Sequence, residues 1–183
     1  SYISNSGPLT VYGGYIEGLN DVSISTGSTL TIEGGEIYNA HTTAITTANC
    51  TTTVNGGTIT STVGTAISQS PGYYDSGNMV INGGTIDAKT YPLYLNTVNA
   101  TINGGTITKN TSGNQVITVT SFATLNYEDG NIIGNKQTAM TVNNSSAVAN
   151  INGGNIESEI DTIVVSNSGT LNVNGGTITS KGK

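Results

Sequence analysis

The sequence predicts an all-β chain folded as a right-handed parallel β-helix, a solenoid of about eight coils with three short strands per coil. The main observation is a seven-residue motif, INGGTIT at 102–108, which recurs eight times with small changes. The first residues of the Gly-Gly pairs in neighbouring copies are 21 to 27 residues apart. A repeat period in this range, together with short strand patterns, is typical of a solenoid.

Each copy of the motif alternates apolar and polar residues on both sides of its glycine pair. This alternation predicts two strands that bury one face each and are separated by a turn. The position before the turn holds Val11, Ile32, Val54, Ile81, Ile102, Tyr127, Ile151 and Val173, and the position after it holds Ile16, Ile37, Ile59, Ile86, Ile107, Ile132, Ile156 and Ile178. We expect both columns to face the core.

The glycine pair is expected to form a corner of each coil. Glycine adopts positive φ without a Cβ clash, and a neighbouring Asn tolerates the left-handed region. In the sixth copy, YEDGNII, Asp129 replaces the first glycine of the pair. Stacked coils would place Asn55, Asn82 and Asn103 over one another, which predicts a hydrogen-bonded side-chain ladder at the corner.

A third inward strand is expected about ten residues after each corner. Val22 and Ile24 form it in the first coil. The later copies are Ala44-Ile45, Ala66-Ile67, Leu93-Tyr94, Val116-Ile117, Ala139-Met140 and Ile163-Val164, so we expect Tyr94 and Tyr127 to lie in the core. One coil cannot bury its own core, so stability must come from stacking on its neighbours. The crossover rule predicts right-handed coiling.

Composition excludes several classes of protein. The chain has 183 residues, a net charge of −6 and no Arg, which argues against nucleic acid as a partner because phosphate binding needs clustered cations. The single Cys50 excludes an internal disulfide, and no apolar run reaches the length of a membrane span. We expect a single β-helix domain over residues 1–183 that is a piece of a longer repeat protein.

The tandem INGGTIT copies and the third strands such as Ala66-Ile67 and Ala139-Met140 resemble the parallel β-helix modules of large bacterial surface proteins. The resemblance covers the whole chain. It implies a right-handed β-helix similar to that of pectate lyases and an extracellular, cell-surface location, and some modules of this kind bind carbohydrate. Members that bind calcium carry Asp-rich turns, which this chain largely lacks.

We expect the chain not to be an enzyme and to carry no cofactor. Pectate lyase chemistry uses an Arg base, and the chain has none. Glycoside hydrolysis needs two carboxylates that face one bond. The candidate groups are Glu157 with Glu159 and Asp161, Glu128 with Asp129, and the cluster of Glu17, Asp21, Glu33 and Glu36, and we interpret each as solvated surface carboxylates. For calcium, the local candidate is Glu157, Glu159 and Asp161, whose carboxylates either converge in a curled loop or point to water.

Exposed tyrosines make carbohydrate recognition the leading prediction, because an aromatic ring can pack against the apolar face of a sugar. One candidate site is Tyr73, Tyr74 and Asp75 on an inserted loop, with Tyr91 in the next coil. A second is Tyr12, Tyr15 and Tyr38 in the first coils. The expected partner is a polysaccharide or a host glycan bound by an adhesin-like module.

Two alternatives stay open. The first alternative is that the chain is a structural stalk or a self-stacking filament unit, in which the open end coils pair with neighbouring units. The other alternative is ice binding by outward Thr-x-Thr ladders such as Thr58 with Thr60 and Thr106 with Thr108. Glu36, Asp87 and Glu157 interrupt these ladders. The irregular copies YEDGNII and IEGGEIY and the Tyr-bearing insertion are the places where function is expected.

Overall fold

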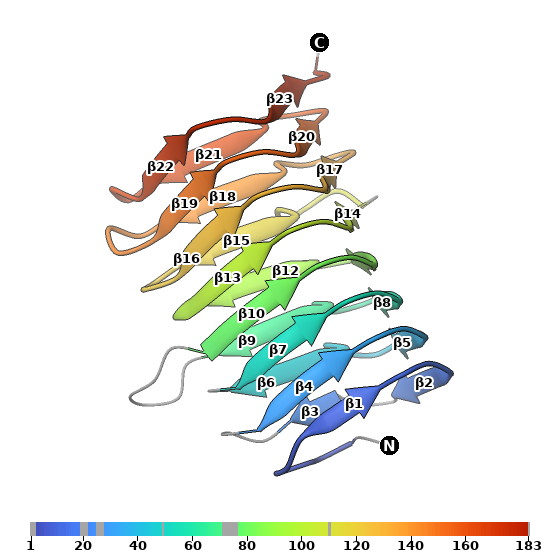
Figure 1. Cartoon of the computed structure of the whole chain (residues 1–183). Helices are drawn as coiled ribbons and strands as arrows, with labels where there is room; N and C mark the ends of the chain where they lie inside the picture. Colours follow the sequence, from blue (N-terminus) through green and yellow to red (C-terminus); the bar gives the residue numbers. More distant parts are fainter. Residues whose placement is uncertain are drawn as a thin grey trace.

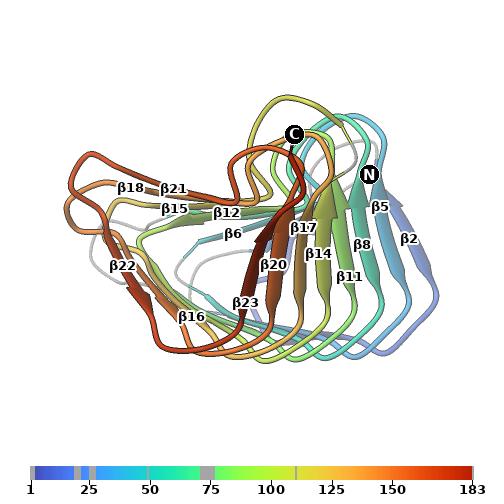
Figure 2. The ribbon, with the colours of Figure 1, turned by 90° about the horizontal axis from the view of Figure 1, so that it is seen from above.

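The computed structural model shows an all-β solenoid whose coils stack from the N-terminal to the C-terminal end (Figure 1). It describes residues 3–18, 22–24, 28–48, 50–70, 77–109 and 111–182. Within these residues there are 23 short strands and no helix. Three parallel sheets form the three sides of the rod (Figure 2). They make seven complete coils and a last coil of two strands.

Sheet A holds the strands that precede each corner, and sheet B holds those that follow it. Sheet A contains β1 (Leu9–Val11), β4 (Thr29–Ile32), β7 (Thr51–Val54), β10 (Gly77–Ile81), β13 (Val98–Ile102), β16 (Thr124–Tyr127), β19 (Val148–Ile151) and β22 (Thr170–Val173). Sheet B contains β2 (Tyr15–Gly18), β5 (Glu36–Asn39), β8 (Thr58–Ser61), β11 (Thr85–Ala88), β14 (Thr106–Lys109), β17 (Asn131–Gly134), β20 (Asn155–Ser158) and β23 (Thr177–Ser180).

Sheet C closes each coil on the third side. It contains β3 (Val22–Ile24), β6 (Ile45–Ala48), β9 (Ile67–Ser70), β12 (Leu93–Asn96), β15 (Ile117–Thr120), β18 (Met140–Asn143) and β21 (Ile163–Ser166). In Figure 1 the front strands of sheet A run from left to right while the chain rises toward its C-terminal end. The solenoid is therefore right-handed, as the crossover rule predicts.

The two predicted apolar columns line the core. The pairing register aligns Ile81 with Ile102 and Ile102 with Tyr127 in sheet A, and it aligns Ile107 with Ile132 in sheet B. These residues are at most 1 % exposed. Burying one such side chain stabilises the fold by about 1.5–3 kcal/mol, and every inner coil repeats the contribution. In the last coil Val173 and Ile178 are 54 % and 41 % exposed because they face the open end of the rod.

The corner glycines confirm the expected backbone geometry. The second glycine of every pair has positive φ, for example +87° at Gly84 and +89° at Gly105. The first glycine is closely packed in most coils for a different reason, because a Cβ on Gly104 would lie 2.8 Å from the Asn82 carbonyl oxygen of the preceding coil. The sixth coil alone has a side chain at this position, that of Asp129.

The predicted asparagine ladder is also confirmed. Asn82 Nδ2 donates to Asn55 Oδ1 and Asn103 Nδ2 donates to Asn82 Oδ1, each at 2.8 Å. The ladder starts at the Glu33 carboxylate, which accepts from Asn55 at 3.0 Å. Each amide donates to the coil before it, so the ladder has one direction along the rod.

Two of the predicted third strands are displaced by one residue. Leu93 pairs with Ile67 and Ile117, so Leu93 takes the inward position and Tyr94 points outward, where it is partly exposed. The prediction that Tyr94 belongs to the core was wrong. Likewise Ile163 pairs with Met140, and Val164 therefore lies outside the inward column. Insertions of different length before these strands hide the register, which only stacking against the neighbouring coils sets.

Candidate functional site

The candidate sugar site of the inserted loop is only partly visible. Tyr73, Tyr74 and Asp75 lie outside the described residues. Tyr91 is partly exposed in the turn before β12, and its ring lies 5.4 Å from that of Tyr94 with an interplanar angle of 54°. Partial burial, and then the neighbouring Tyr94, raise the pKa of Tyr91. Tyr91 therefore belongs to a tyrosine pair that the sequence did not predict.

The candidate calcium ligands lie at the end of sheet B. Glu157 is on β20 and forms an ion pair with Lys181 at 2.7 Å, while Glu159 and Asp161 are exposed in the turn that follows. Among the residues that the structure describes, no three His, Cys, Asp or Glu side chains are grouped to hold a metal ion. Calcium binding by this segment stays a prediction.

The first two coils place aromatic rings and carboxylates alternately on the outer face of sheet B. The register aligns Tyr15 with Glu36 and Glu17 with Tyr38, so each ring has a carboxylate beside it. The Tyr15 and Tyr38 rings stack with centroids 6.4 Å apart and an interplanar angle of 24°. Tyr15 is 57 % exposed. We call these four residues the aromatic platform.

The electrostatics of the aromatic platform favour hydrogen-bond donation by its phenol. Partial desolvation, and then the negative charges of Glu17 and Glu36, raise the pKa of Tyr15. A hydrogen bond with the Glu17 side chain raises the Tyr15 pKa further, so the Tyr15 hydroxyl donates to that carboxylate. The platform thus presents one flat apolar surface with two carboxylates at its edge, whose remaining oxygen lone pairs can accept hydrogen bonds.

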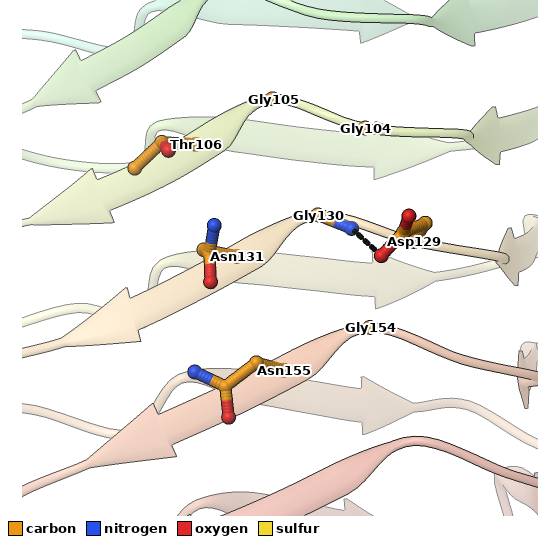
Figure 3. A pocket seen from close by; sticks show the side chains of 8 residues that line it. All are labelled: Gly104, Gly105, Thr106, Asp129, Gly130, Asn131, Gly154 and Asn155. Atoms are coloured by element: carbon orange, nitrogen blue, oxygen red, sulfur yellow. Dashed lines mark hydrogen bonds between the residues drawn. The ribbon is translucent and has the colours of Figure 1, made fainter.

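A shallow concavity of about 620 Å³ lies at the corners of coils five to seven. We call it the corner groove. Its floor is the backbone of three successive corners, and Figure 3 shows the side chains of Thr106, Asn131 and Asn155 in a row on one side of it. Asp129 lies on the other side of Gly130. The groove is lined by Gly104, Gly105, Thr106, Asp129, Gly130, Asn131, Gly154 and Asn155.

Tyr127 supports the floor of the corner groove from inside. Its hydroxyl lies 2.6 Å from the Gly130 carbonyl oxygen and 3.0 Å from that of Asn155, so its single proton is shared between them with the shorter bond to Gly130, and it accepts from the Asn155 amide at 3.1 Å. Burial raises the pKa of Tyr127 to about 12. A Cβ on Gly154 would lie 2.5 Å from this hydroxyl, so the larger inward residue depends on a glycine in the next coil.

The asparagine ladder is interrupted beside the corner groove. In the sixth coil Glu128 occupies the ladder position, and its carboxylate accepts from Asn152 Nδ2 at 2.8 Å. Asn174 then donates to Asn152, also at 2.8 Å. A carboxylate cannot donate, and within the described residues no hydrogen bond joins Glu128 to Asn103. Among the described residues, the corner position therefore carries two ladders, each starting at a Glu.

Lys109 is a polar residue that the sequence interpretation missed. It is fully buried at the end of β14, where its Nζ donates to the Lys89 carbonyl oxygen and to Thr111 Oγ1. Desolvation lowers the pKa of Lys109. The spacing could have predicted this burial, because Lys109 follows the inward Ile107 by two residues and therefore lies on the same face of the strand. The contacts indicate a structural role in the turn after sheet B.

Comparisons with protein-family models, with curated proteins and with solved structures found no match. The structure shows a parallel β-solenoid, and no family is assigned. The described residues contain no helix that is long and apolar enough to cross a membrane.

Proposed function

We propose that this chain is a non-catalytic module of an extracellular bacterial surface protein that recognises glycans on the outer face of sheet B. The observation that carries the proposal is the aromatic platform, in which stacked Tyr15 and Tyr38 alternate with Glu17 and Glu36. The bacterial, cell-surface and adhesin-like setting rests on the resemblance of the repeat alone.

The chemistry of the platform suits a sugar ring. The apolar face of a pyranose can pack on a tyrosine ring, and its hydroxyls can donate to the flanking carboxylates. Tyrosine contributes a large contact area with few rotatable bonds, so little entropy is lost when a ligand binds. The strands β2 and β5 hold the rings on a paired sheet, which keeps their spacing nearly constant before and after binding.

The test compares the platform with an exposed aromatic ring elsewhere on the rod. Tyr15→Ala/Tyr38→Ala removes both rings of the platform, and the control Phe122→Ala removes a ring that is 71 % exposed in the turn before β16. Binding to an array of neutral and acidic glycans, followed by calorimetry on the best ligand, is the measurement. We expect the first variant to lose about tenfold or more in affinity, the loss expected for a buried aromatic contact, and the control to bind as wild type.

A third variant separates the platform from the inserted loop. If Tyr73→Ala/Tyr74→Ala abolishes glycan binding while Tyr15→Ala/Tyr38→Ala does not, the loop is the site and the platform is not. If the wild-type chain binds no glycan on the array, recognition as the function is rejected.

A second candidate function is that of a structural stalk or self-stacking unit, and the continuous parallel pairing of the coils in all three sheets favours it. Val165 on β21, Val173 on β22 and Ile178 on β23 are 42, 54 and 41 % exposed. Sedimentation velocity over a range of concentrations tests this function. Association that Val173→Lys abolishes supports it, and a monomer at every concentration contradicts it.

The structure does not strengthen the alternative of ice binding. The register of sheet B places Glu36 beside Thr58 and Asp87 beside Thr60 and Thr108. Charged side chains therefore stand within the Thr columns, as the sequence predicted. A measurement of thermal hysteresis tests this alternative directly, and its absence would reject ice binding.

A further inference from the structure

We propose that the corner groove is a second subsite for the same glycan and that it binds an uncharged sugar unit. The inference rests on the proposed glycan recognition and assigns a place and a sugar class to it. It is carried by three features of coils five to seven: a floor made mostly of glycine, acceptor oxygens with spare hydrogen-bonding capacity at its edge, and a row of unused amide and hydroxyl groups.

The floor is open because four of the five corner residues that line it are glycines, and only Asp129 carries a side chain. Gly105 and Gly154 have φ of +89° and +70°, and a Cβ at either position would lie within 2.8 Å of the neighbouring coil. The backbone of these corners is therefore exposed over three coils. A flat ligand ring can approach it without displacing any side chain.

The acceptor rim is the place where the asparagine ladder stops. Elsewhere the amide of each coil donates to the oxygen of the coil before it, as Asn103 does to Asn82. Glu128 cannot donate, and within the described residues Asn103 Oδ1 accepts no hydrogen bond from the sixth coil. Asn103 and Glu128 lie beside the groove, next to the lining residues Gly104 and Asp129. Asp129 adds a further carboxylate, of which one oxygen accepts from the Gly130 amide at 2.7 Å. Sugar hydroxyls would supply the missing donors.

The opposite rim is a row of outward side chains on sheet B. Thr106 pairs with Asn131, and Asn131 pairs with Asn155, so the three lie one above another with about 4.8 Å between strands. Their side chains form no hydrogen bond within the described part of the chain. Figure 3 shows the row beside the bare corners. It offers both donors and acceptors to a polyhydroxyl ligand.

The same column of sheet B joins the groove to the aromatic platform. Its members in order are Tyr15, Glu36, Thr58, Thr85, Thr106, Asn131, Asn155 and Thr177. Four strand spacings separate Tyr15 from Thr106, which corresponds to roughly 19 Å. One glycan chain that lies parallel to the rod axis would span both places, and two linked contacts bind more tightly than either alone.

The charges of the groove select the sugar class. Glu128 and Asp129 are negative, Lys109 is buried below the surface, and the chain contains no Arg. A uronate or a sulfated sugar would meet like charge without a compensating cation. The groove therefore fits a neutral sugar and rejects an acidic one.

The deciding variant restores the repeat rather than damaging it. Glu128→Asn/Asp129→Gly converts YEDGNII to YNGGNII, so the fold is kept while the acceptor rim is removed. The probes are β-1,4-linked hexasaccharides and disaccharides of glucose, mannose and xylose, measured by calorimetry. We expect about tenfold weaker binding of the preferred hexasaccharide and unchanged binding of its disaccharide, which the platform alone holds.

A second pair of variants tests the amide row with a matched control. Asn131→Ala/Asn155→Ala removes it, and Asn78→Ala/Asn99→Ala removes two exposed Asn side chains from the outer face of sheet A. We expect several-fold weaker hexasaccharide binding by the first variant and no change with the second. Equal effects of both pairs would overturn the proposal.

The outcomes separate this subsite from the proposed function. If Tyr15→Ala/Tyr38→Ala weakens binding and Glu128→Asn/Asp129→Gly does not, glycan recognition stands and the corner groove is not a subsite. If no probe binds the wild-type chain, both proposals fail. If calcium chloride alone binds and Glu128→Asn/Asp129→Gly abolishes that binding while no hexasaccharide binds, the groove is a cation site and the sugar proposal is overturned.

Discussion

The fourth and sixth coils use the same architecture with different residues at the corner. In the fourth coil the motif INGGTID has Ile81 inside, Asn82 in the ladder and two glycines at the turn. In the sixth coil YEDGNII has a tyrosine inside, a glutamate in the ladder and an aspartate for the first glycine. Both corners keep a second glycine with positive φ, +87° at Gly84 and +107° at Gly130.

The difference shows which parts of the corner the fold requires. The backbone geometry of the second glycine is kept in every coil, so it is a condition of stacking. The ladder amide and the first glycine are replaced in the sixth coil, and there the corner gains two carboxylates and the hydroxyl of a buried tyrosine. The replacements add acceptor oxygens beside a floor made mostly of glycine, and among the residues described the ladder amide of the preceding coil, Asn103, receives no hydrogen bond from this coil.

The largest effect is expected from a side chain at a second glycine. Gly84→Ala places a Cβ 2.8 Å from the Gly57 carbonyl oxygen at a φ of +87°. We expect it to lower the free energy of unfolding by about 3 kcal/mol, since strain and a backbone clash combine. Urea denaturation followed by circular dichroism measures the loss.

Gly113→Ala is the matched control for this prediction. Gly113 also has positive φ, +123°, but a Cβ there meets no atom within 4 Å. We expect a loss of about 1 kcal/mol from the backbone conformation alone. Equal losses at Gly84 and Gly113 would show that contact between coils does not determine the need for glycine.

The next effect concerns the hydroxyl that distinguishes the sixth coil from its neighbours. Tyr127→Phe keeps the ring and removes the donor to the carbonyl oxygens of Gly130 and Asn155. We expect the free energy of unfolding to fall by about 2 kcal/mol, because buried polar groups lose their partner. Tyr38→Phe, on the sheet surface, is the control and is expected to change stability by less than about 0.5 kcal/mol. A fall no larger than that of the control would contradict the prediction.

Tyr127 also predicts a dependence on pH. Its pKa is raised to about 12 in the folded chain, against about 10 for an unperturbed tyrosine, so the folded state binds this proton more tightly. The contribution of the more tightly bound Tyr127 proton to the free energy of unfolding is complete below pH 10 and is lost as pH rises toward 12. The difference in stability between wild type and Tyr127→Phe should therefore shrink from pH 10 to 12 in denaturation at each pH. A constant difference would show that the proton is not held by folding.

The smallest effect is expected from repairing the ladder. In Glu128→Asn the new amide can donate to Asn103 Oδ1 and still accept from Asn152, so one continuous ladder would run from Glu33 to Asn174. We expect a gain of about 0.5 kcal/mol, since the site is exposed to water. Asn82→Ala, which breaks two ladder bonds, should have the opposite sign. A loss of stability in Glu128→Asn would indicate that the carboxylate has another partner.

Much of the fold followed from local rules in the sequence. The columns that contain Ile107 and Ile132, the glycine corners and the ladder of Asn55, Asn82 and Asn103 were all predicted, and the structure confirms them. Alternation of period two and the need for positive φ act within a few residues, so a repeated motif displays them directly.

The candidate sites were less accessible from the sequence because they depend on contacts between coils. Tyr94 turned outward because the register of sheet C is set by stacking, and varied insertions hide that register from the spacing. The stacking of Tyr15 on Tyr38 and the row of Thr106, Asn131 and Asn155 join residues 23 to 25 positions apart. The missing hydrogen bond between Glu128 and Asn103 Oδ1 follows only from the direction of the ladder, which the structure shows.

The sequence alone was therefore sufficient for the type of coil, its corner and its core, because these repeat in every copy and obey local backbone physics. The neighbours of each outward side chain were decided by the tertiary structure. In a solenoid the strand register brings together residues one full coil apart, and that register depends on how the whole coil packs on the next. The two proposed sugar-binding places, the aromatic platform and the corner groove, are products of this stacking.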